Sequence, residues 1–211
     1  MEKIRDVLKK HGFTFKKNLG QNFLTDENLL DSIAEAAGIG KSDTVVEIGC
    51  GAGTLTRALS KLAGRVYAYE IDRDLRPVLA ETLAGCENTE VIFRDFSKEN
   101  LGELYREIGE YTVVANLPYY VTTPIVTRLL EEGAGVRGVC VMVQQEVAER
   151  FAAKEDTPEY GAITAAIALR GTAKIVKKVG RNMFYPAPNV DSAVVKIDFT
   201  ENALPVKDKD M

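Results

Sequence analysis

The sequence predicts an α/β fold with a doubly wound, mixed sheet of about seven strands. Five short β-rich runs alternate with helical stretches, an order typical of parallel strands joined by right-handed crossovers. Two further β-rich runs near the end of the chain are joined by an irregular segment, which adds a strand pair that is not parallel. The 211 residues are enough for one domain with a substantial core.

Each strand of the parallel part is followed by a helix. The strands are predicted at 44–48, 66–70, 90–93, 111–115 and 138–143, and their helices at 55–62, 75–83, 98–108, 124–132 and 146–153. Residues 163–169 are predicted to be helical, and 173–179 and 193–199 to be the two final strands. An amphipathic helix over 26–37 precedes the first strand, with Thr25 or Asp26 as its cap and Gly38 at its end.

The composition is that of a soluble globular protein. Hydrophobic residues make up 45% and charged residues 27% of the chain, and no apolar run approaches the ~20 residues that span a bilayer. The N-terminus lacks the apolar core of a signal peptide. We therefore expect a cytoplasmic protein without membrane contact. Cys50, Cys86 and Cys140 are scattered without metal-ligand spacing, so no metal is expected.

Basic residues gather in two segments although the formal net charge is −4. One segment ends with Lys16 and Lys17, and the other runs from Arg170 to Arg181. Local basic patches bind phosphates even on an acidic protein. The candidate RNA contacts are Lys16, Lys17, Lys177, Lys178 and Arg181. The alternative is that these residues form ordinary solvated faces of helices and strands.

A glycine-rich loop follows the first predicted strand, where Glu47 precedes Gly49, Gly51 and Gly53. A dinucleotide fingerprint requires a third glycine where this chain has Thr54. The GxGxG pattern with an acidic residue ahead of it instead resembles motif I of S-adenosylmethionine-dependent methyltransferases. Gly49 and Gly51 are therefore candidate cofactor contacts.

Acidic residues follow the next two strands. Glu70 is suited to accept hydrogen bonds from both hydroxyls of a ribose, and Ile71 beside it could cover an adenine ring. Asp95 can accept from the adenine N6 amine, and Phe96 is a neighbouring candidate contact. Because the carboxyl ends of adjacent parallel strands converge on one crevice, these residues and the glycine loop predict one site for S-adenosylmethionine.

Asn116-Leu117-Pro118-Tyr119 follows the fourth predicted strand. Asn116 offers a neutral carbonyl oxygen and an NH2 group together, Pro118 stiffens the backbone, and Tyr119 adds a flat aromatic face. This combination suits a grip on an exocyclic amine of a planar ring, such as N6 of adenine. The alternative is a strand-to-helix turn with a solvated asparagine.

Two further motifs give a family resemblance. Together with EIGCGAG, Glu70 and NLPYY, the segments KKNLGQNFL (16–24) and FYPAPNVDS (184–192) closely resemble the small-subunit rRNA adenine-N6,N6-dimethyltransferases, from about residue 16 to residue 199. The resemblance implies a Rossmann-like class I methyltransferase fold. It also implies cofactor contacts, which are Gln21, Asn22, Leu24, Gly49, Glu70, Asp95 and Asn116.

The implied activity is dimethylation of adenines in the 16S-type rRNA of an immature 30S-type particle, by a monomer. We expect the Asn116 side-chain oxygen and the Leu117 carbonyl to accept from the N6 hydrogens. Tyr119 and Phe184 are expected to stack on opposite faces of an unstacked adenine. Three alternatives remain, which are a packing role for Phe184, a large-subunit rRNA target, and a non-catalytic role in ribosome assembly.

We expect a basic N-terminal arm over 1–25, a catalytic domain over 26–200 and a polar tail over 201–211. Members of the family usually continue into a small helical domain that helps to bind rRNA. That domain is expected to be absent here, either because the chain is truncated or because it is naturally short. Cofactor binding should survive, whereas rRNA binding and turnover are expected to be weaker.

Overall fold

The computed structural model describes residues 4–16 and 19–200, so Lys17 and the predicted tail over 201–211 lie outside the described residues. Within these residues, the main sheet has seven strands in the order β4-β3-β2-β5-β6-β9-β7. Strands β2 to β6 are parallel to one another, whereas β9 is antiparallel to both β6 and β7. The predicted doubly wound, mixed sheet is therefore confirmed.

The strands and helices lie close to their predicted positions. The strands of the main sheet are β2 (Thr44–Ile48), β3 (Arg65–Tyr69), β4 (Thr89–Ile92), β5 (Tyr111–Asn116), β6 (Val136–Gln144), β7 (Gly171–Val179) and β9 (Ser192–Phe199). The helices around them are α2 (Glu27–Ala36), α3 (Thr54–Leu62), α4 (Arg76–Thr82), α5 (Leu101–Ile108), α6 (Tyr119–Glu132), α7 (Gln145–Phe151) and α8 (Ala162–Arg170). Short 3-10 turns are η2 (Arg73–Leu75), η3 (Phe96–Lys98) and η4 (Arg181–Met183).

The first residues of helices α2 and α6 show how local chemistry sets helix boundaries. Asp26, rather than Thr25, caps α2, because its side chain accepts from the Leu29 backbone N–H at 2.8 Å. Helix α6 begins at Tyr119, so the predicted start at residue 124 was wrong. Proline is common in the first turn of a helix, but Pro124 lies inside α6, and Pro118 precedes its first residue.

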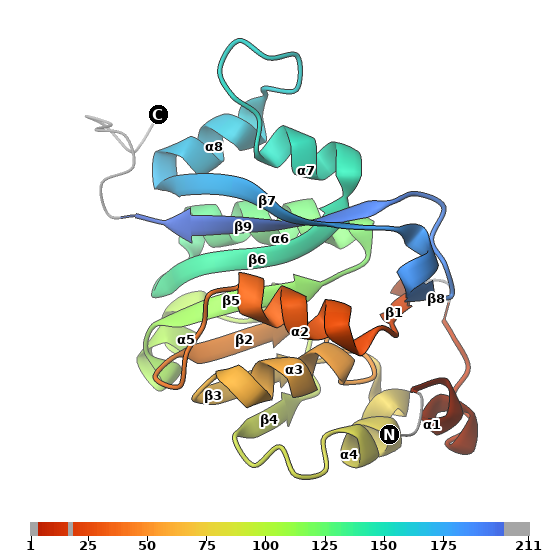
Figure 1. Cartoon of the computed structure of the whole chain (residues 1–211). Coiled ribbons are helices and arrows are strands. Elements are labelled where there is room, and N and C mark those ends of the chain that lie inside the picture. Colours follow the sequence, from red (N-terminus) through yellow and green to blue (C-terminus); the bar gives the residue numbers. More distant parts are fainter. Residues whose placement is uncertain (1–3, 17–18, 201–211) are drawn as a thin grey trace.

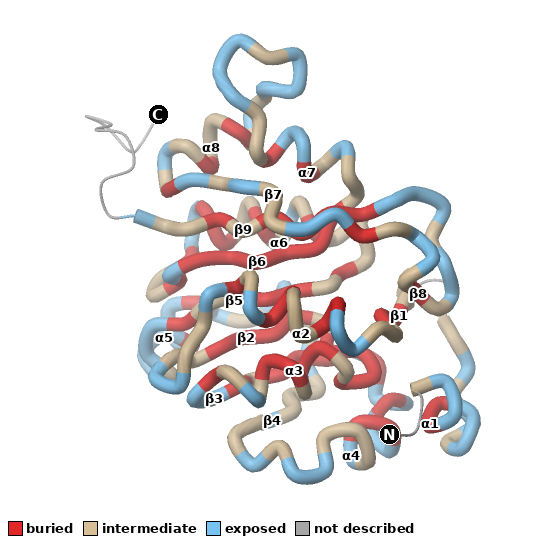
Figure 2. The backbone as a smooth tube through the Cα atoms, in the orientation of Figure 1, coloured by how far each residue is buried: buried red, intermediate tan, exposed pale blue. Residues whose placement is uncertain are grey.

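Helices cover both faces of the sheet (Figure 1). Helices α2 and α3 pack on the face that contains Val45 and Val66, and α4 extends this layer beside β3. Helices α5, α6, α7 and α8 pack on the opposite face, which contains Val46 and Val113. The central strands β2, β5, β6 and β9 are mostly buried, whereas the edge strands β4 and β7 are more exposed (Figure 2), as expected for a sheet that is covered on both sides at its centre.

Two further structures were not predicted. Helix α1 (Ile4–Lys10) lies in the basic arm, and β1 (Phe23–Leu24) pairs antiparallel with β8 (Phe184–Tyr185). Strands of two residues carry no readable periodicity, and their pairing depends on contacts between distant parts of the chain. The β1–β8 pair places the end of the arm beside the predicted irregular segment at one end of the main sheet (Figure 1).

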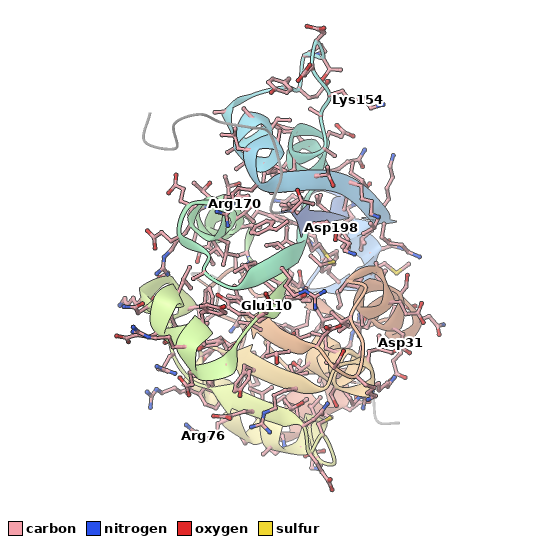
Figure 3. All side chains as sticks on the ribbon, turned by 90° about the vertical axis from the view of Figure 1, so that its left-hand side faces the viewer. Asp31, Arg76, Glu110, Lys154, Arg170 and Asp198 are labelled. Atoms are coloured by element: carbon pink, nitrogen blue, oxygen red, sulfur yellow. The ribbon has the colours of Figure 1, made fainter. Side chains whose placement is uncertain are left out.

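Charged side chains cover the outside of the molecule, among them Asp31, Glu110 and Lys154 (Figure 3). Within residues 4–16 and 19–200, no helix is long and apolar enough to cross a membrane. The same part of the chain contains no group of three or more His, Cys, Asp or Glu side chains that could hold a metal ion.

Candidate active site

A cavity of about 570 Å³ lies at the carboxyl ends of four parallel strands. Gly49 follows β2, Glu70 follows β3, Asp95 comes after β4, and Asn116 ends β5, and all four residues line the cavity. The chain order reverses between β2 and β5, which is where open α/β sheets bind their ligands. The fold therefore gathers these predicted residues around a space that suits a small-molecule ligand.

The glycine loop between β2 and α3 forms one wall of the cavity. Gly49 and Gly51 have φ of +73° and +56°, left-handed values that other residues rarely adopt. A Cβ atom at Gly51 would lie 2.9 Å from the Phe23 ring, and one at Gly49 would lie 2.9 Å from Leu117. Glycine at both positions therefore allows these two neighbours to close on the loop.

The Glu70 carboxylate is buried and fixed by three backbone N–H groups. Its Oε2 accepts from Gly51 at 2.7 Å, and its Oε1 accepts from Ile71 and Asp72, both at 2.8 Å. Burial raises the pKa of Glu70, and these hydrogen bonds act in the opposite direction. The carboxylate is held rigidly at the cavity wall, and its remaining lone pairs suit the predicted ribose contact.

Glu47 lines the cavity but was not predicted as a site residue. It is 1% exposed, and its Oε2 has no hydrogen-bond partner among the described residues. Burial raises the pKa of Glu47 to about 8. Near pH 7 this carboxyl group therefore carries a proton, and its Oε2, beside the cavity, is available for a hydrogen bond with a ligand. The available signal was one acidic residue inside the otherwise apolar strand Thr44–Ile48.

The predicted adenine contacts differ in their exposure. Ile71 is 55% exposed at the cavity, which leaves its side chain available to cover a ring. The Asp95 carboxylate accepts from the Ser97 N–H at 3.0 Å and lies 2.7 Å from the Ser97 hydroxyl, so it is already oriented. The Phe96 ring is buried against Tyr69, with 5.1 Å between ring centroids, and its main role in the structure is packing.

Asn116 and Leu117 line the cavity where β5 leads into α6. The Asn116 side chain has no hydrogen-bond partner in the described part of the chain, and it lines the cavity. Leu117 is buried against the glycine loop. The predicted contact for the adenine amine is therefore a polar group that no described side chain occupies.

The two tyrosines after Pro118 have different surroundings. The Tyr119 hydroxyl lies 2.8 Å from the hydroxyl of the fully buried Ser192. Tyr120 is 64% exposed, and both rings line the cavity. The hydrogen bond to Ser192 fixes the orientation of the Tyr119 ring at the start of α6. A ring with a fixed orientation is suited to stack on a base.

Phe184 is buried in the structure. It is 4% exposed and packs in one core cluster with Leu24, Leu30 and Met142. This surrounding favours the packing alternative, although part of Phe184 also lines the cavity. Stacking of Phe184 on a base therefore stays a prediction.

The arm residues Gln21, Asn22 and Leu24 also line the cavity. The Asn22 side chain donates to the Gly20 carbonyl at 3.0 Å, and Leu24 is 1% exposed within the β1–β8 pair. Gln21 donates to a carboxylate oxygen of Asp72 at 2.8 Å. The structure thus places the arm against the predicted cofactor site.

The predicted RNA contacts fall into two groups. Lys16 Nζ lies 2.6 Å from carboxylate oxygens of both Asp72 and Asp74, so a phosphate would compete with two carboxylates for it. Lys177 and Lys178 are exposed near the end of β7, and Arg181 is exposed in η4. Because β7 is parallel to β6, these three residues, which we call the basic edge, lie at the cavity end of the sheet.

Comparisons with known proteins agree with this geometry. The family model described as "Ribosomal RNA adenine dimethylase" matches residues 12–211. "Ribosomal RNA small subunit methyltransferase A" of Bacillus licheniformis is 46% identical over 98% of this chain and 72% of that protein. The protein of the same name from Geobacillus thermodenitrificans is 47% identical over 92% of this chain and 68% of that protein.

Solved structures give the same result. A dimethyladenosine transferase from Plasmodium falciparum superposes with a TM-score of 0.77 at 31% identity, over 88% of this chain and 66% of that one. The 23S rRNA methyltransferase ErmE superposes with a TM-score of 0.72 at 32% identity, over 85% of this chain and 70% of that one. The chain spans roughly two thirds of both structures. By its sequence, its fold and the arrangement of its cavity, this chain belongs to the ribosomal RNA adenine dimethylase family.

Proposed function

We propose that this chain transfers methyl groups from S-adenosylmethionine to N6 of adenines in small-subunit rRNA and produces N6,N6-dimethyladenosine during ribosome maturation. The observation that carries the proposal is the Asn116 side chain, which has no hydrogen-bond partner among the described residues and shares one cavity with the glycine loop and Glu70. A group that can hold an amine thus lies beside a site that suits a nucleoside-containing methyl donor. The name of the relatives indicates the small subunit as the target.

The donor half of the cavity has the chemistry that this cofactor requires. Glu70 would accept from the ribose hydroxyls, Asp95 from the adenine amine, and Ile71 would cover the adenine ring. The buried carboxyl group of Glu47, whose Oε2 has no partner in the described residues, is available for a hydrogen bond with the donor. When bound, S-adenosylmethionine supplies an activated methyl group on its sulfonium.

The acceptor half would orient the target amine. The N6 lone pair of adenine is delocalised into the ring and must be turned toward the methyl group. Acceptance of the two N6 hydrogens by the Asn116 side-chain oxygen and the Leu117 carbonyl would favour a more tetrahedral nitrogen, so orientation is the main contribution of the protein. The proton then leaves after transfer, and Tyr119 would stack on the base.

The basic edge is the proposed contact for the rRNA backbone. Lys177, Lys178 and Arg181 lie at the same end of the sheet as Asn116, so phosphates bound there would flank an adenine in the cavity. We further propose that the substrate is an immature 30S-type particle, that the chain acts as a monomer, and that it acts in the cytoplasm. We place no metal in the reaction, because methyl transfer from a sulfonium requires none.

Incubation of the chain with labelled S-adenosylmethionine and ribosomal particles tests the proposal. Immature 30S particles should yield labelled N6,N6-dimethyladenosine after nucleoside digestion, whereas 30S particles that are already dimethylated should not. The likeness to ErmE favours large-subunit rRNA as a second candidate target, so 50S particles form a parallel arm. Label in neither particle, with S-adenosylmethionine binding intact, would favour a non-catalytic role in assembly.

A charge reversal tests the basic edge separately. Lys177→Glu with Lys178→Glu should weaken RNA binding and reduce its salt dependence by about one unit of slope for each phosphate that is no longer neutralised. Lys41→Glu is a matched control, because Lys41 is exposed at the opposite end of the sheet, before β2. An unchanged salt slope in the double variant would contradict the assignment.

A further inference from the structure

Asp72 is a fully buried carboxylate that joins the N-terminal arm to the body of the protein. Its side chain is 0% exposed. It accepts from Lys16 Nζ at 2.6 Å, from Gln21 Nε2 at 2.8 Å and from the Asp74 backbone N–H at 3.1 Å. These bonds hold the pKa of Asp72 below its usual value against the effect of burial, which raises it. Two of the three donors belong to the arm.

The same residue is also joined to the donor site. The Asp72 backbone N–H donates to Glu70 Oε1 at 2.8 Å, and Glu70 Oε2 accepts from Gly51 at 2.7 Å. A continuous series of hydrogen bonds therefore runs from Lys16 and Gln21 through Asp72 and Glu70 to the glycine loop. A displacement of the arm would break the first links of this series.

Gln21 is held from both sides. Its Nε2 donates to Asp72, and its Oε1 accepts from the Lys16 backbone N–H at 2.9 Å. Asn22 and Leu24 follow directly and line the cavity. The position of Gln21 therefore sets where these two residues meet the donor site.

An apolar contact supports the same closure. The Phe23 ring packs so closely on the glycine loop that a Cβ atom at Gly51 would lie 2.9 Å from it. Phe23 also contacts the rings of Phe13 and Phe15, with centroid distances of 6.1 and 5.4 Å. Aromatic rings can pack against one another in several orientations. The charged hydrogen bonds of Asp72 require a defined geometry and therefore hold the arm in one position.

We infer that Asp72 is a positioning residue for methyl transfer, whose carboxylate latches Lys16 and Gln21 so that the arm closes over the bound donor. The inference rests on the proposed function, because it takes S-adenosylmethionine as the ligand under the arm. It gives Lys16 a role in the latch instead of a contact with RNA. Neither Asp72 nor Lys16 needs to touch the reacting atoms.

The test measures S-adenosylmethionine binding to the full chain in the absence of RNA. Asp72→Asn keeps the shape of the side chain but removes the charge, and it should raise the Kd about tenfold and speed dissociation by a similar factor. Lys16→Gln should have an effect in the same direction. Asp74→Asn is the matched control, since Asp74 shares Lys16 but its side chain is 70% exposed, and its Kd should stay within about twofold.

Two readouts separate positioning from a general loss of structure. Asp72→Asn should raise the KM for S-adenosylmethionine while kcat at saturating donor stays within about threefold. Hydrogen exchange of residues 19–24 should become faster, whereas exchange in β2 and β5 should not change.

The double variant with Lys16→Gln should bind no more weakly than Asp72→Asn alone, because both remove the same link.

A wild-type Kd and dissociation rate in Asp72→Asn would overturn the inference. If that variant does not fold, the milder Lys16→Gln decides, and a wild-type Kd there has the same consequence. Failure of the unaltered chain to bind S-adenosylmethionine would instead refute the proposed function. The two failures are therefore distinguishable.

Discussion

The two halves of the cavity are built in opposite ways. In the donor half, the polar groups of the glycine loop and Glu70 are bonded to one another, while the Oε2 of Glu47 has no partner among the described residues. The Gly49 and Cys50 N–H groups donate to the Tyr69 carbonyl at 2.9 and 3.0 Å, and Gly51 donates to Glu70. In the acceptor half, the Asn116 side chain has no hydrogen-bond partner within the described residues, and Tyr120 is 64% exposed.

This difference matches the two kinds of ligand. A small donor of fixed shape binds best to groups that are already oriented, because little ordering remains at the moment of binding. An adenine of a large RNA arrives from solvent, so it needs an open entrance and a polar group that is free to bind it. The donor half is therefore expected to control affinity for the cofactor, and the acceptor half to control turnover.

The largest expected effect concerns Glu47 in the donor half. Its pKa of about 8 in the folded protein lies above the ordinary value of 4.5. Between pH 4.5 and about pH 8, Glu47 is therefore protonated in the folded protein and ionised in the unfolded protein. Stability should therefore fall as pH rises through this window, by at most about 5 kcal/mol at ~1.4 kcal/mol per pKa unit. Glu47→Gln should flatten the curve.

Urea unfolding at several pH values between 5 and 9 measures this effect. The gap in unfolding free energy between Glu47→Gln and the unaltered protein should widen up to about pH 8 and then stay constant. Glu87→Gln, at an exposed glutamate outside the cavity, controls for the loss of a carboxyl group. Parallel curves for Glu47→Gln and the unaltered protein would show that Glu47 carries no such proton.

The second prediction separates turnover from affinity in the acceptor half. Asn116→Ala should lower kcat about 100-fold or more, because the N6 amine loses its orientation, while the Kd for S-adenosylmethionine stays within about tenfold. Thr112→Ala, at the other end of β5, should leave both values unchanged. A kcat close to that of the unaltered protein would remove Asn116 from the proposed mechanism.

The third prediction is the counterpart in the donor half. Gly51→Ala should weaken S-adenosylmethionine binding about tenfold, since its φ of +56° is left-handed and its Cβ would meet Phe23 at 2.9 Å. Gly85→Ala has a comparable φ of +88° with no atom within 4 Å of the added Cβ. It should cost about 1–2 kcal/mol of stability without any change in binding. Equal binding by both variants would argue against a special role of the glycine loop.

The strands and the cavity residues at their carboxyl ends were predicted from the sequence for one reason, whereas Gln21, Asn22 and Leu24 were implied only by the family resemblance. Strand ends can be read from local patterns, and Glu70, Asp95 and Asn116 all lie at the end of an apolar run or within two residues after it. Parallel pairing then brings such ends together without further information. The predicted arrangement of the site depended on topology more than on any single side chain.

What the sequence did not predict depends on distant partners. Asp72 is an ordinary acidic residue in the sequence, and its role becomes visible only through Lys16, which is 56 positions away. The β1–β8 pair and the burial of Phe184 depend on contacts between residues near 24 and residues near 184. Glu47 was visible as an acid in an apolar strand, but the missing partner of its Oε2 is a property of the packed structure.

The smallest expected effect concerns the hydrogen bond that orients Tyr119. Tyr119→Phe keeps the ring but leaves the fully buried Ser192 hydroxyl without its partner at 2.8 Å, which should cost about 1–2 kcal/mol of stability. Turnover should fall by only a few-fold, because the stacking surface remains. A cycle with Ser192→Ala measures the coupling, and the double variant should be no less stable than Tyr119→Phe alone, since it removes the orphaned hydroxyl as well. Strictly additive losses would mean that the two hydroxyls act independently, and Tyr119 would then be oriented by the packing of α6 alone.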